Sequence, residues 1–294
     1  MVAPSGPVDP VRLEAGCAVL RGLGLGLEVV VGKHVLGRVT LAEAEPVPPG
    51  WQALAAPDAG RAADIQDAWC DPRIRALLCA RGGYGATRVL DHLDWTAMSA
   101  HEPKILHGSS DVTALHVAFG RRLGITTSFG PMVAGLLAEN EPASAGHARA
   151  ALFGPGEPVT GGHALVPGRA SGVLTGGNLA LLAALAGTRY AARPATGGIA
   201  LLEDVTEEPY RIDRMLGQLL QAGWFDGVAG FALGSWLDCG DHDELAAVFR
   251  ARLGPLGVPI LAGLPIGHGS PQLTVQLGAP AELDTSNGIL RQRH

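Results

Sequence analysis

The sequence predicts an α/β protein built on a parallel sheet. Short apolar runs alternate with segments of helical pattern along the first half of the chain, which is typical of right-handed βαβ units. Hydrophobic residues make up 47% of the chain and charged residues 17%, a balance that excludes a solvated, disordered chain. Glycine supplies 42 of the 294 residues, about twice the average usage, and its lack of a three-residue period excludes collagen. We therefore expect a folded chain with many tight turns.

The elements of the first half follow one another in βαβ order. A short strand at 2–3 ends in the turn-forming residues of 4–7. The order then continues with a helix at 10–23, a strand at 27–31, a helix at 61–69, a strand at 76–80, a helix at 87–93, a strand at 105–107 and a helix at 112–121. A parallel strand normally has about five residues, so either the strand at 2–3 is truncated or the true start of the chain lies upstream.

A domain boundary is expected at 154–172. This stretch is rich in turn-forming residues, carries few charges and shows no helical period. It divides the chain into an N-terminal domain at 1–153, a linker at 154–172 and a C-terminal domain at 173–294. The C-terminal domain is predicted to contain helices at 179–186 and 211–222 and strands at 199–202, 228–234 and 258–262. No internal repeat is visible.

Charge and cysteine usage exclude several kinds of partner. The formal net charge is −6, and the sequence has no basic stripe, which argues against a nucleic-acid partner. The four cysteines are far apart and form no CxxC pair, which argues against a structural zinc site or a disulfide framework. The first residues lack the regions of a signal peptide, and no run approaches the ~18 apolar residues of a membrane span. We expect a cytoplasmic protein with no membrane partner.

Polar residues follow four predicted strands, at the edge where open α/β sheets bind ligands. One of these segments, 81–85, reads Arg-Gly-Gly-Tyr-Gly and lies between a strand and a helix. It lacks the third glycine of the dinucleotide-binding fingerprint, so a cofactor site is disfavoured. Two interpretations stay open: a structural turn, or a loop whose backbone N–H groups face a reacting centre.

The other three segments contain a serine, a carboxylate and a histidine. Segment 108–111 has the layout of a nucleophile elbow around Ser110, although a helix N-cap explains the same residues. Glu203 ends an apolar run, where it is either exposed or held in a site. His268 lies between two glycines that leave its imidazole approachable, and a structural histidine is the alternative. Together they could form a nucleophile, an orienting acid and a general base, although spacing alone does not show that they meet.

One further cluster, Asp241-His242-Asp243-Glu244, has metal-binding residue types. Asp241 and Glu244 also have the spacing of a capping box in front of an apolar helical run. We favour the cap and expect no metal.

At these motifs the sequence resembles the LD-carboxypeptidases (muramoyltetrapeptide carboxypeptidases), a serine peptidase family that also includes the microcin C immunity peptidases. The matching stretches occur in the family's order and cover nearly the whole chain outside 32–57 and 133–170. They are VAPSGPVDP at 2–10, RAADIQDAWCDPRIRALLCARGGYGATRVLDHLDW at 61–95, GSSDVTALH at 108–116, FGPM at 129–132, GGNLALLAALAGT at 176–188, LLEDVTEEPYRIDRMLGQL at 201–219 and GLPIGHGSPQLTVQLGAPAELD at 263–284.

The resemblance implies a fold and a set of site residues. The expected fold is an N-terminal Rossmann-like parallel-sheet domain followed by a C-terminal swivelling, β-rich α/β domain, with the active site in the cleft between them and usually a homodimer. By matching motif, the family's catalytic triad falls on Ser110, Glu203 and His268. Its oxyanion hole falls on the backbone N–H of Asp111 with a glycine of the loop, Gly82 or Gly83.

Two departures from the family pattern affect these expectations. The residue before the nucleophile is usually aromatic, whereas here it is Ser109. This puts the pocket shape in question and makes Ser109 a weak rival nucleophile. The N-terminal strand is also shorter than the family's.

The implied reaction is hydrolysis that releases the terminal D-alanine of a murein tetrapeptide, without a metal or an organic cofactor. The D-alanine carboxylate needs a cationic anchor, for which Arg81, Arg211 and Arg214 are candidates by position. One alternative within the family is an immunity-type peptidase that cleaves an aminoacyl-nucleotide antibiotic. A second alternative is a catalytically silent binding protein that keeps the two-domain cleft.

Overall fold

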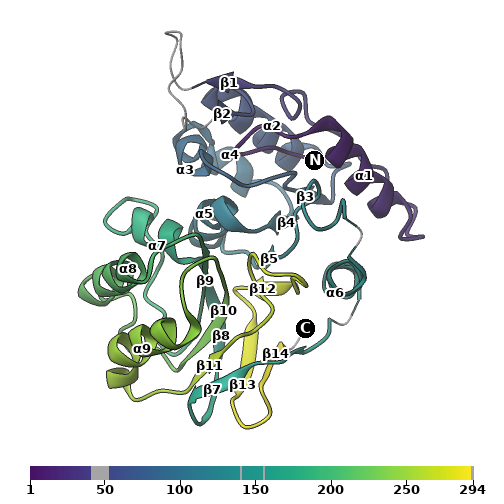
Figure 1. The fold of residues 1–294 in the computed structure, drawn as a ribbon. Coiled ribbons are helices and arrows are strands. Elements are labelled where there is room, and N and C mark those ends of the chain that lie inside the picture. The colour runs from purple at the N-terminus through teal and green to yellow at the C-terminus, as the bar shows by residue number, and fades with distance from the viewer. Residues whose placement is uncertain (41–52, 140, 155, 293–294) are drawn as a thin grey trace.

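The computed structural model describes residues 1–40, 53–139, 141–154 and 156–292, and these form two parts, each built around its own sheet (Figure 1). The N-terminal part has a four-stranded sheet in the order β12-β5-β4-β3. Strands β3 to β5 are parallel, and β12 pairs with β5 in the antiparallel direction. The bounds are β3 Ala76–Leu78, β4 Ile105–Gly108, β5 Thr127–Phe129 and β12 Val275–Leu277, with a separate pair β1 Val39–Thr40 and β2 Ala53–Leu54.

Helices surround this small sheet and supply its core. They are α1 Pro10–Arg21, α2 Asp58–Cys70, α3 Ala86–Val89, α4 Trp95–Ser99, α5 Thr113–Leu123 and the 3-10 helices η1 Leu90–His92 and η2 Ser110–Val112. Trp69 of α2 packs edge-on against Phe119 of α5 with ring centroids 5.1 Å apart. These rings and the buried Leu77 and Leu106 belong to one apolar cluster. The strand that leads to Ser110 therefore rests on a rigid apolar layer.

The C-terminal part has an eight-stranded mixed sheet in the order β6-β14-β13-β8-β9-β10-β11-β7. Its centre, β8 to β11, is parallel, and antiparallel strands flank it on both sides. The strands are β6 Val159–Thr160, β7 His163–Val166, β8 Arg169–Asn178, β9 Ile199–Val205, β10 Gly230–Leu237, β11 Ile260–Ala262, β13 Pro280–Asp284 and β14 Ile289–Gln292.

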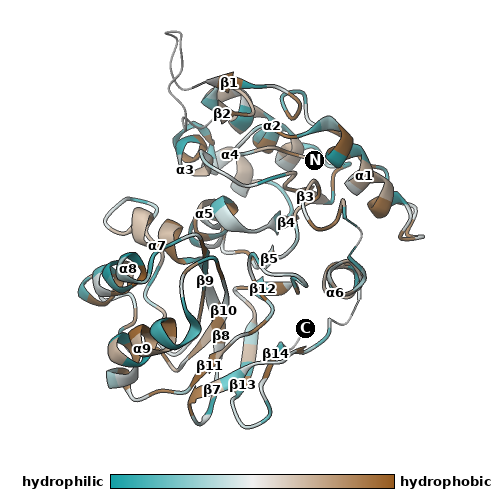
Figure 2. Cartoon of the chain, in the orientation of Figure 1, coloured by the Kyte–Doolittle hydropathy of each residue, from teal (hydrophilic) through white to brown (hydrophobic). Residues whose placement is uncertain are grey.

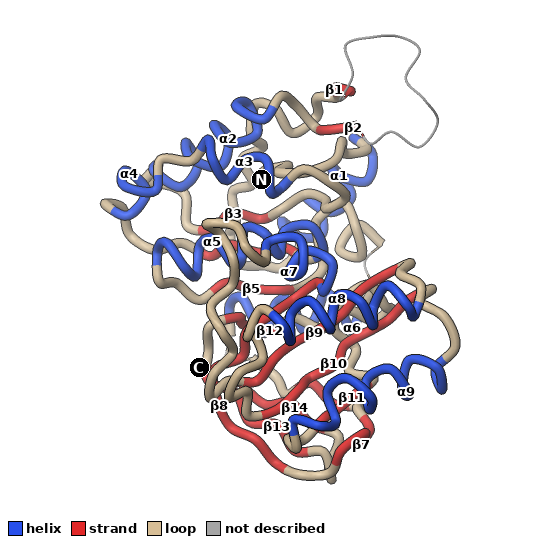
Figure 3. The backbone as a smooth tube through the Cα atoms, turned by 90° about the vertical axis from the view of Figure 1, so that its left-hand side faces the viewer, coloured by secondary structure: helices blue, strands red, loops and turns tan. Residues whose placement is uncertain are grey.

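Helices cover one face of this sheet, as the turned view in Figure 3 shows. They are α7 Leu179–Leu185, α8 Pro209–Gln221 and α9 His242–Leu253, the last followed by the 3-10 helix η3 Gly254–Leu256. Their apolar sides pack on Leu202, Phe231 and Ile260. Figure 2 shows mixed teal and brown on α8 and α9, as expected of helices with one buried face. The opposite sheet face forms a second apolar cluster that includes Val275 and Leu277 of β12, so it contacts the smaller sheet.

The predicted α/β fold with two parts is confirmed, and most predicted elements lie within a few residues of the observed ones. The strand expected at 27–31 is wrong: the segment is irregular, and Val30 and Val31 are exposed. Its carbonyl at Val30 accepts a hydrogen bond from the N-terminal amine instead of joining a ladder. The expected strand at 2–3 is a single parallel bridge between Val2 and Cys79.

The turn-rich segment 154–172 is more regular than we expected. It contains β6, β7 and the first residues of β8, all in the eight-stranded sheet. Before it, α6 (Pro142–Phe153) lies apart from the other helices in Figure 1. The division at 153 and 173 stays a prediction, because β12 of the C-terminal half completes the N-terminal sheet.

Two further expectations concern the cysteines and membrane-spanning helices. All four cysteines are free, as the spacing predicted. Within the described ranges, no helix is both long and apolar enough to cross a bilayer.

Candidate active site

Ser110 occupies a sharp strand-to-helix turn. It lies two residues after the end of β4 at Gly108, begins η2 and has a φ of 60°. A non-glycine residue in this left-handed region is strained, as in the nucleophile elbows of hydrolases. The carbonyl of Gly108 fixes the turn by accepting hydrogen bonds from Gly130 N at 3.1 Å and His116 Nε2 at 2.9 Å. The turn therefore presents the Ser110 hydroxyl on a supported backbone.

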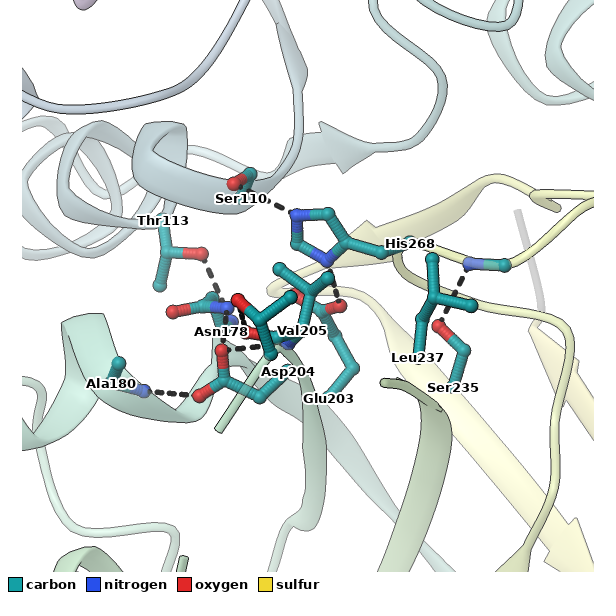
Figure 4. Close-up of polar contacts among 12 residues, drawn as sticks. Ser110, Thr113, Asn178, Ala180, Glu203, Asp204, Val205, Ser235, Leu237 and His268 are labelled. Atoms are coloured by element: carbon teal, nitrogen blue, oxygen red, sulfur yellow. Dashed lines mark hydrogen bonds and ion pairs between the residues drawn. The ribbon is translucent and has the colours of Figure 1, made fainter. Parts of the chain in front are cut away.

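Three predicted side chains form one hydrogen-bonded line, shown in Figure 4. His268 Nε2 lies 2.9 Å from Ser110 Oγ, and His268 Nδ1 lies 2.7 Å from Glu203 Oε2. A carboxylate can only accept, so Nδ1 carries the imidazole proton and Nε2 accepts from the serine hydroxyl. Residues 158 and 65 positions apart in the sequence are thus brought together. This is the geometry of a nucleophile, a base and an orienting acid.

Glu203 is completely buried near the end of β9. Its Oε1 has no hydrogen-bond partner among the described residues, so the carboxylate depends on its contact with His268. Gly267 makes room for that contact. A Cβ at this position would lie 2.3 Å from Glu203 Oε2, and its φ of 113° also favours glycine.

The surroundings of His268 favour its charged form. Burial lowers the pKa of His268, but the hydrogen bond to Glu203 and the charges of Glu203 and Asp204 raise it, and the net effect is a pKa above the ordinary value. Ser235 of β10 supports the loop on both sides of the imidazole. Its Oγ accepts from Gly269 N at 3.0 Å, and its N donates to Ile266 O at 2.8 Å.

The glycine loop lies directly beside the serine. A Cβ on Gly82 would come within 3.1 Å of Ser110 Cβ and 3.3 Å of Ser110 Oγ. The Gly82 carbonyl accepts from Gly6 N at 3.1 Å. Because a trans peptide points its C=O and the next N–H in opposite directions, the N–H of Gly83 points away from Gly6. The loop thus approaches Ser110 with backbone and no side chain.

Asp111 ties this turn to its neighbours through its side chain. Its Oδ2 accepts from Ser5 Oγ at 2.6 Å and from Ala86 N at 2.8 Å. Burial raises the pKa of Asp111, against the effect of these hydrogen bonds. Buried Arg61 holds the same region, since its guanidinium donates to the carbonyls of Pro4 and Gly85.

The remaining residues predicted for the site lie outside the Ser110–His268–Glu203 line. Ser109 is buried and N-caps η2, but His268 contacts Ser110, so the geometry favours Ser110 as the nucleophile. Arg81 is exposed and donates to Pro7 O at 2.8 Å. Arg211 pairs with Glu207 at 2.6 Å, and the guanidinium of Arg214 lies over the Tyr210 ring. None of the three contacts described for these arginines reaches the Ser110–His268–Glu203 line.

Sequence reasoning missed the supporting side chains. His116 and Ser235 hold the backbone on either side of the line, while Ser144 and His147 of α6 accept from the backbone N–H groups of Gln272 and Thr274, further along the His268 loop. Burial lowers the pKa of His116 to about 4, so it is a neutral structural histidine. A hydroxyl or imidazole that fixes a loop has no sequence period, so no signal was available for these residues.

Metal binding finds no support in the described part of the chain, where no group of three or more metal-ligating side chains is gathered. Asp241 accepts from the N–H groups of Asp243 and Glu244 and so caps α9, as the spacing predicted.

Comparison with known families matches both halves of the chain. Residues 1–130 match the LD-carboxypeptidase N-terminal domain, and residues 171–283 match the LD-carboxypeptidase C-terminal domain. The first match contains β3, β4 and β5 of the smaller sheet, and the second contains β9, β10 and β11 of the larger sheet together with β12.

Individual relatives and solved structures extend this similarity over the full length. A Streptomyces coelicolor protein provisionally named a carboxypeptidase is 52% identical, with 99% of this chain and 91% of that protein covered. A murein tetrapeptide carboxypeptidase of Pseudomonas aeruginosa is 33% identical, with coverages of 97% and 92%. The muramoyltetrapeptide carboxypeptidase of Oxalobacter formigenes has a TM-score of 0.81 at 26% identity, with 99% and 96% covered. The microcin C7 self-immunity protein in complex with aspartyl sulfamoyl adenosine shares the fold, with a TM-score of 0.83 at 20% identity and coverages of 100% and 94%.

Proposed function

The chain belongs to the LD-carboxypeptidase family, and from this premise we propose that it is a serine carboxypeptidase that releases the terminal D-alanine of murein tetrapeptides. The bond hydrolysed joins an L-configured centre, of meso-diaminopimelate or lysine, to D-alanine. The observation that carries the proposal is the hydrogen-bonded line from Ser110 through His268 to Glu203. The 33% identity to a murein tetrapeptide carboxypeptidase supports the substrate class.

The reaction follows from the roles of these three side chains. His268 Nε2 takes the proton of Ser110 as its Oγ attacks the scissile carbonyl, and Glu203 holds the imidazole tautomer and stabilises the imidazolium. His268 then gives its proton to the leaving amine of D-alanine, and an acyl-enzyme on Ser110 remains. Water, deprotonated by the same imidazole, attacks this ester and releases the tripeptide.

The oxyanion of the tetrahedral intermediate would be stabilised by backbone donors. We assign this role to the N–H of Asp111, the second residue of η2, and to the glycine loop at Gly82 and Gly83. Two features support the assignment: Gly82 lies against Ser110, and the N–H of Gly83 points away from Gly6.

The D-alanine carboxylate requires a cation. Arg81 borders the glycine loop, is exposed and donates to the neutral carbonyl of Pro7, whereas Arg211 pairs with the Glu207 carboxylate and Arg214 lies over the Tyr210 ring. We therefore rank Arg81 first. Replacing each arginine by alanine in turn should raise KM most at the anchor, and an unchanged KM in all three variants would reject the set.

We also propose that the protein works as a homodimer in the cytoplasm, as the resemblance to the family implies. Analytical ultracentrifugation of the purified protein would show a dimer mass, and a monomer mass at working concentration would reject this. Cell fractionation would show the protein with the cytoplasmic markers and would contradict the proposal if it followed periplasmic or secreted markers.

One experiment separates the candidate functions. The purified protein is incubated with the L,D-tetrapeptide and, separately, with an aminoacyl sulfamoyl adenosine, and the released D-alanine or amino acid is detected by mass. We expect D-alanine release, with a loss of roughly 10³- to 10⁶-fold in Ser110→Ala. Ser109→Ala is the matched control and should remain active.

The other outcomes are equally informative. Release from the adenosine conjugate alone would show an immunity-type peptidase. Cleavage of neither compound would favour a silent binding protein. An active Ser110→Ala with an inactive Ser109→Ala would overturn the assignment of the nucleophile.

A further inference from the structure

A second hydrogen-bonded chain runs beside the Ser110–His268–Glu203 line and joins the two parts of the molecule. It begins at Thr113, which lies three residues after Ser110. The Oγ1 atom of Thr113 accepts a hydrogen bond from Asn178 N at 3.0 Å. Asn178 Nδ2 in turn donates to Asp204 Oδ1 at 2.8 Å. Asp204 follows Glu203 in β9, and Figure 4 shows both chains of contacts side by side. The helix that follows the serine and the strand that carries the acid are thus connected.

The backbone is shaped to allow this connection. Gly177 has a φ of 134°, and a Cβ there would lie 2.7 Å from Thr113 Oγ1. Only a residue without a side chain lets the end of β8 approach the N-terminus of α5 so closely. The glycine at 177 therefore permits the close approach to Thr113.

Asp204 is the last residue in this series of hydrogen bonds, and several contacts hold it in place. It is buried, and its carboxylate accepts from Asn178 Nδ2, Ala180 N and Val205 N within 2.9 Å. Because side chains alternate along a strand, Asp204 faces α7 while Glu203 faces His268. A shift of Asp204 along or across the strand would move Glu203 with it.

We propose that Asp204, acting through Asn178 and Thr113, is a positioning residue that fixes the strand bearing Glu203 against α5, the helix that follows Ser110. The proposal rests on the function proposed above. It adds a second carboxylate that touches no substrate and that keeps serine, imidazole and acid in line.

The charge of Asp204 provides a distinctive signature of this role. Burial, with a smaller contribution from Glu203, raises the pKa of Asp204 to about 6 against the effect of its hydrogen bonds, so the carboxylate is ionised above that pH. Its charge is one of the influences that raise the pKa of His268. The other titratable groups around Asp204 are the Cys239 thiol after β10 and, beside the same thiol, Glu207.

The test measures kcat, KM and the pH profile of tetrapeptide hydrolysis in four variants. Asp204→Asn and Thr113→Val should lower kcat by about 10- to 100-fold, the scale of a misplacement near 1 Å, with KM nearly unchanged. Thr113→Ser keeps the hydroxyl and should restore most of the rate. The matched control Asp243→Asn, an exposed aspartate in the first turn of α9, should behave as wild type.

The pH profile separates positioning from general destabilisation. Removing the Asp204 charge should move the acidic limb of kcat/KM to lower pH, whereas Thr113→Val should leave the limb in place. Wild-type kcat in both variants would overturn the proposal, as would a loss that appears in KM alone. Where Asp204→Asn fails to fold, the Thr113→Val and Thr113→Ser pair decides the question.

A readout without substrate distinguishes this proposal from the proposed function. The Nδ1 proton of His268, which bonds to Glu203 at 2.7 Å, is observed by NMR in the wild type, Asp204→Asn and Thr113→Val, with its signal assigned from a His268→Gln variant. Loss of this signal in both Asp204→Asn and Thr113→Val supports the proposal even where the wild type hydrolyses neither test compound, and an unchanged signal in both overturns it.

Discussion

Replacing Gly267 by alanine should disable the candidate site without replacing Ser110, His268 or Glu203. The new Cβ would lie 2.3 Å from Glu203 Oε2 and 2.8 Å from Ser235 Oγ. An ordinary contact begins near 3.4 Å, so the carboxylate must move by roughly 1 Å. The 2.7 Å hydrogen bond from His268 to Glu203 would then exceed the length at which such bonds persist.

The expected cost follows from this displacement. A misplacement of 1 Å in an active site costs about 10²-fold in rate, and complete loss of the orienting acid costs about 10⁴-fold. We therefore expect Gly267→Ala to lower kcat by about 10²- to 10⁴-fold. The φ of 113° adds backbone strain of about 1–3 kcal/mol for alanine, which should appear as a lower Tm.

The assay is D-alanine release from the tetrapeptide, followed together with a thermal melt of each variant. Gly269→Ala is the matched control, because Gly269 flanks the same histidine, its Cβ would come no closer than 3.2 Å to Ser235 Cβ, and the change should cost no more than about threefold. A folded Gly267→Ala protein with kcat within about threefold of wild type would refute the reasoning, as would equal losses in both variants.

Three further predictions follow from the structure. The base must be neutral to accept the serine proton, so kcat/KM should fall as the pH drops through the raised pKa of His268, with a midpoint above 6.5; a midpoint at or below 6.5 would contradict this. Arg61→Ala removes a buried cation from the carbonyls of Ala56, Pro4 and Gly85, and urea unfolding should show a loss of about 3–5 kcal/mol. The exposed Arg73→Ala serves as its control and should leave the urea midpoint unchanged, and similar midpoints in the two variants would contradict the buried role. Gly16→Ala would place a Cβ 1.9 Å from Val133 O and should lower the free energy of unfolding by about 1–3 kcal/mol. Its control is Gly146→Ala, which has open space around the new Cβ and should raise the free energy of unfolding by up to about 1 kcal/mol. Equal Tm shifts in the two variants would refute the distinction.

Local patterns predicted the local structure well. The strand at 76–80 and the helix at 61–69 were identified because their apolar periods and flanking turns agree with one another. The same reasoning failed at 27–31, where Val30 and Val31 are exposed and the segment pairs with no strand among the described residues. A hydrophobic run becomes a strand only where the fold supplies a partner, and a short segment does not contain that information.

The candidate site, like the fold, contains residues that the sequence predicts and residues that it does not. Ser110, Glu203 and His268 are predicted because each follows an apolar strand and because motifs around them match a known family. Whether these three side chains come together depends on pairing between strands that are distant in the sequence. The spacing of the residues along the sequence does not show that pairing. Thr113 and Asp204 were missed because a lone hydroxyl and the second residue of a Glu-Asp pair are ordinary residues at strand ends, and only the contacts reveal their partners.

The antiparallel pairing of β12 with β5 has a consequence for synthesis of the chain. The two strands are far apart in the sequence, so the N-terminal sheet keeps an open edge at β5 until β12 has emerged. Long-range pairing of this kind folds slowly and leaves an edge that can associate with other strands. His268 lies just before β12 and arrives with it. A nascent chain that already contains Ser110 therefore lacks His268 beside the serine, and the contacts among Ser110, His268 and Glu203 form only after these later residues have been synthesised.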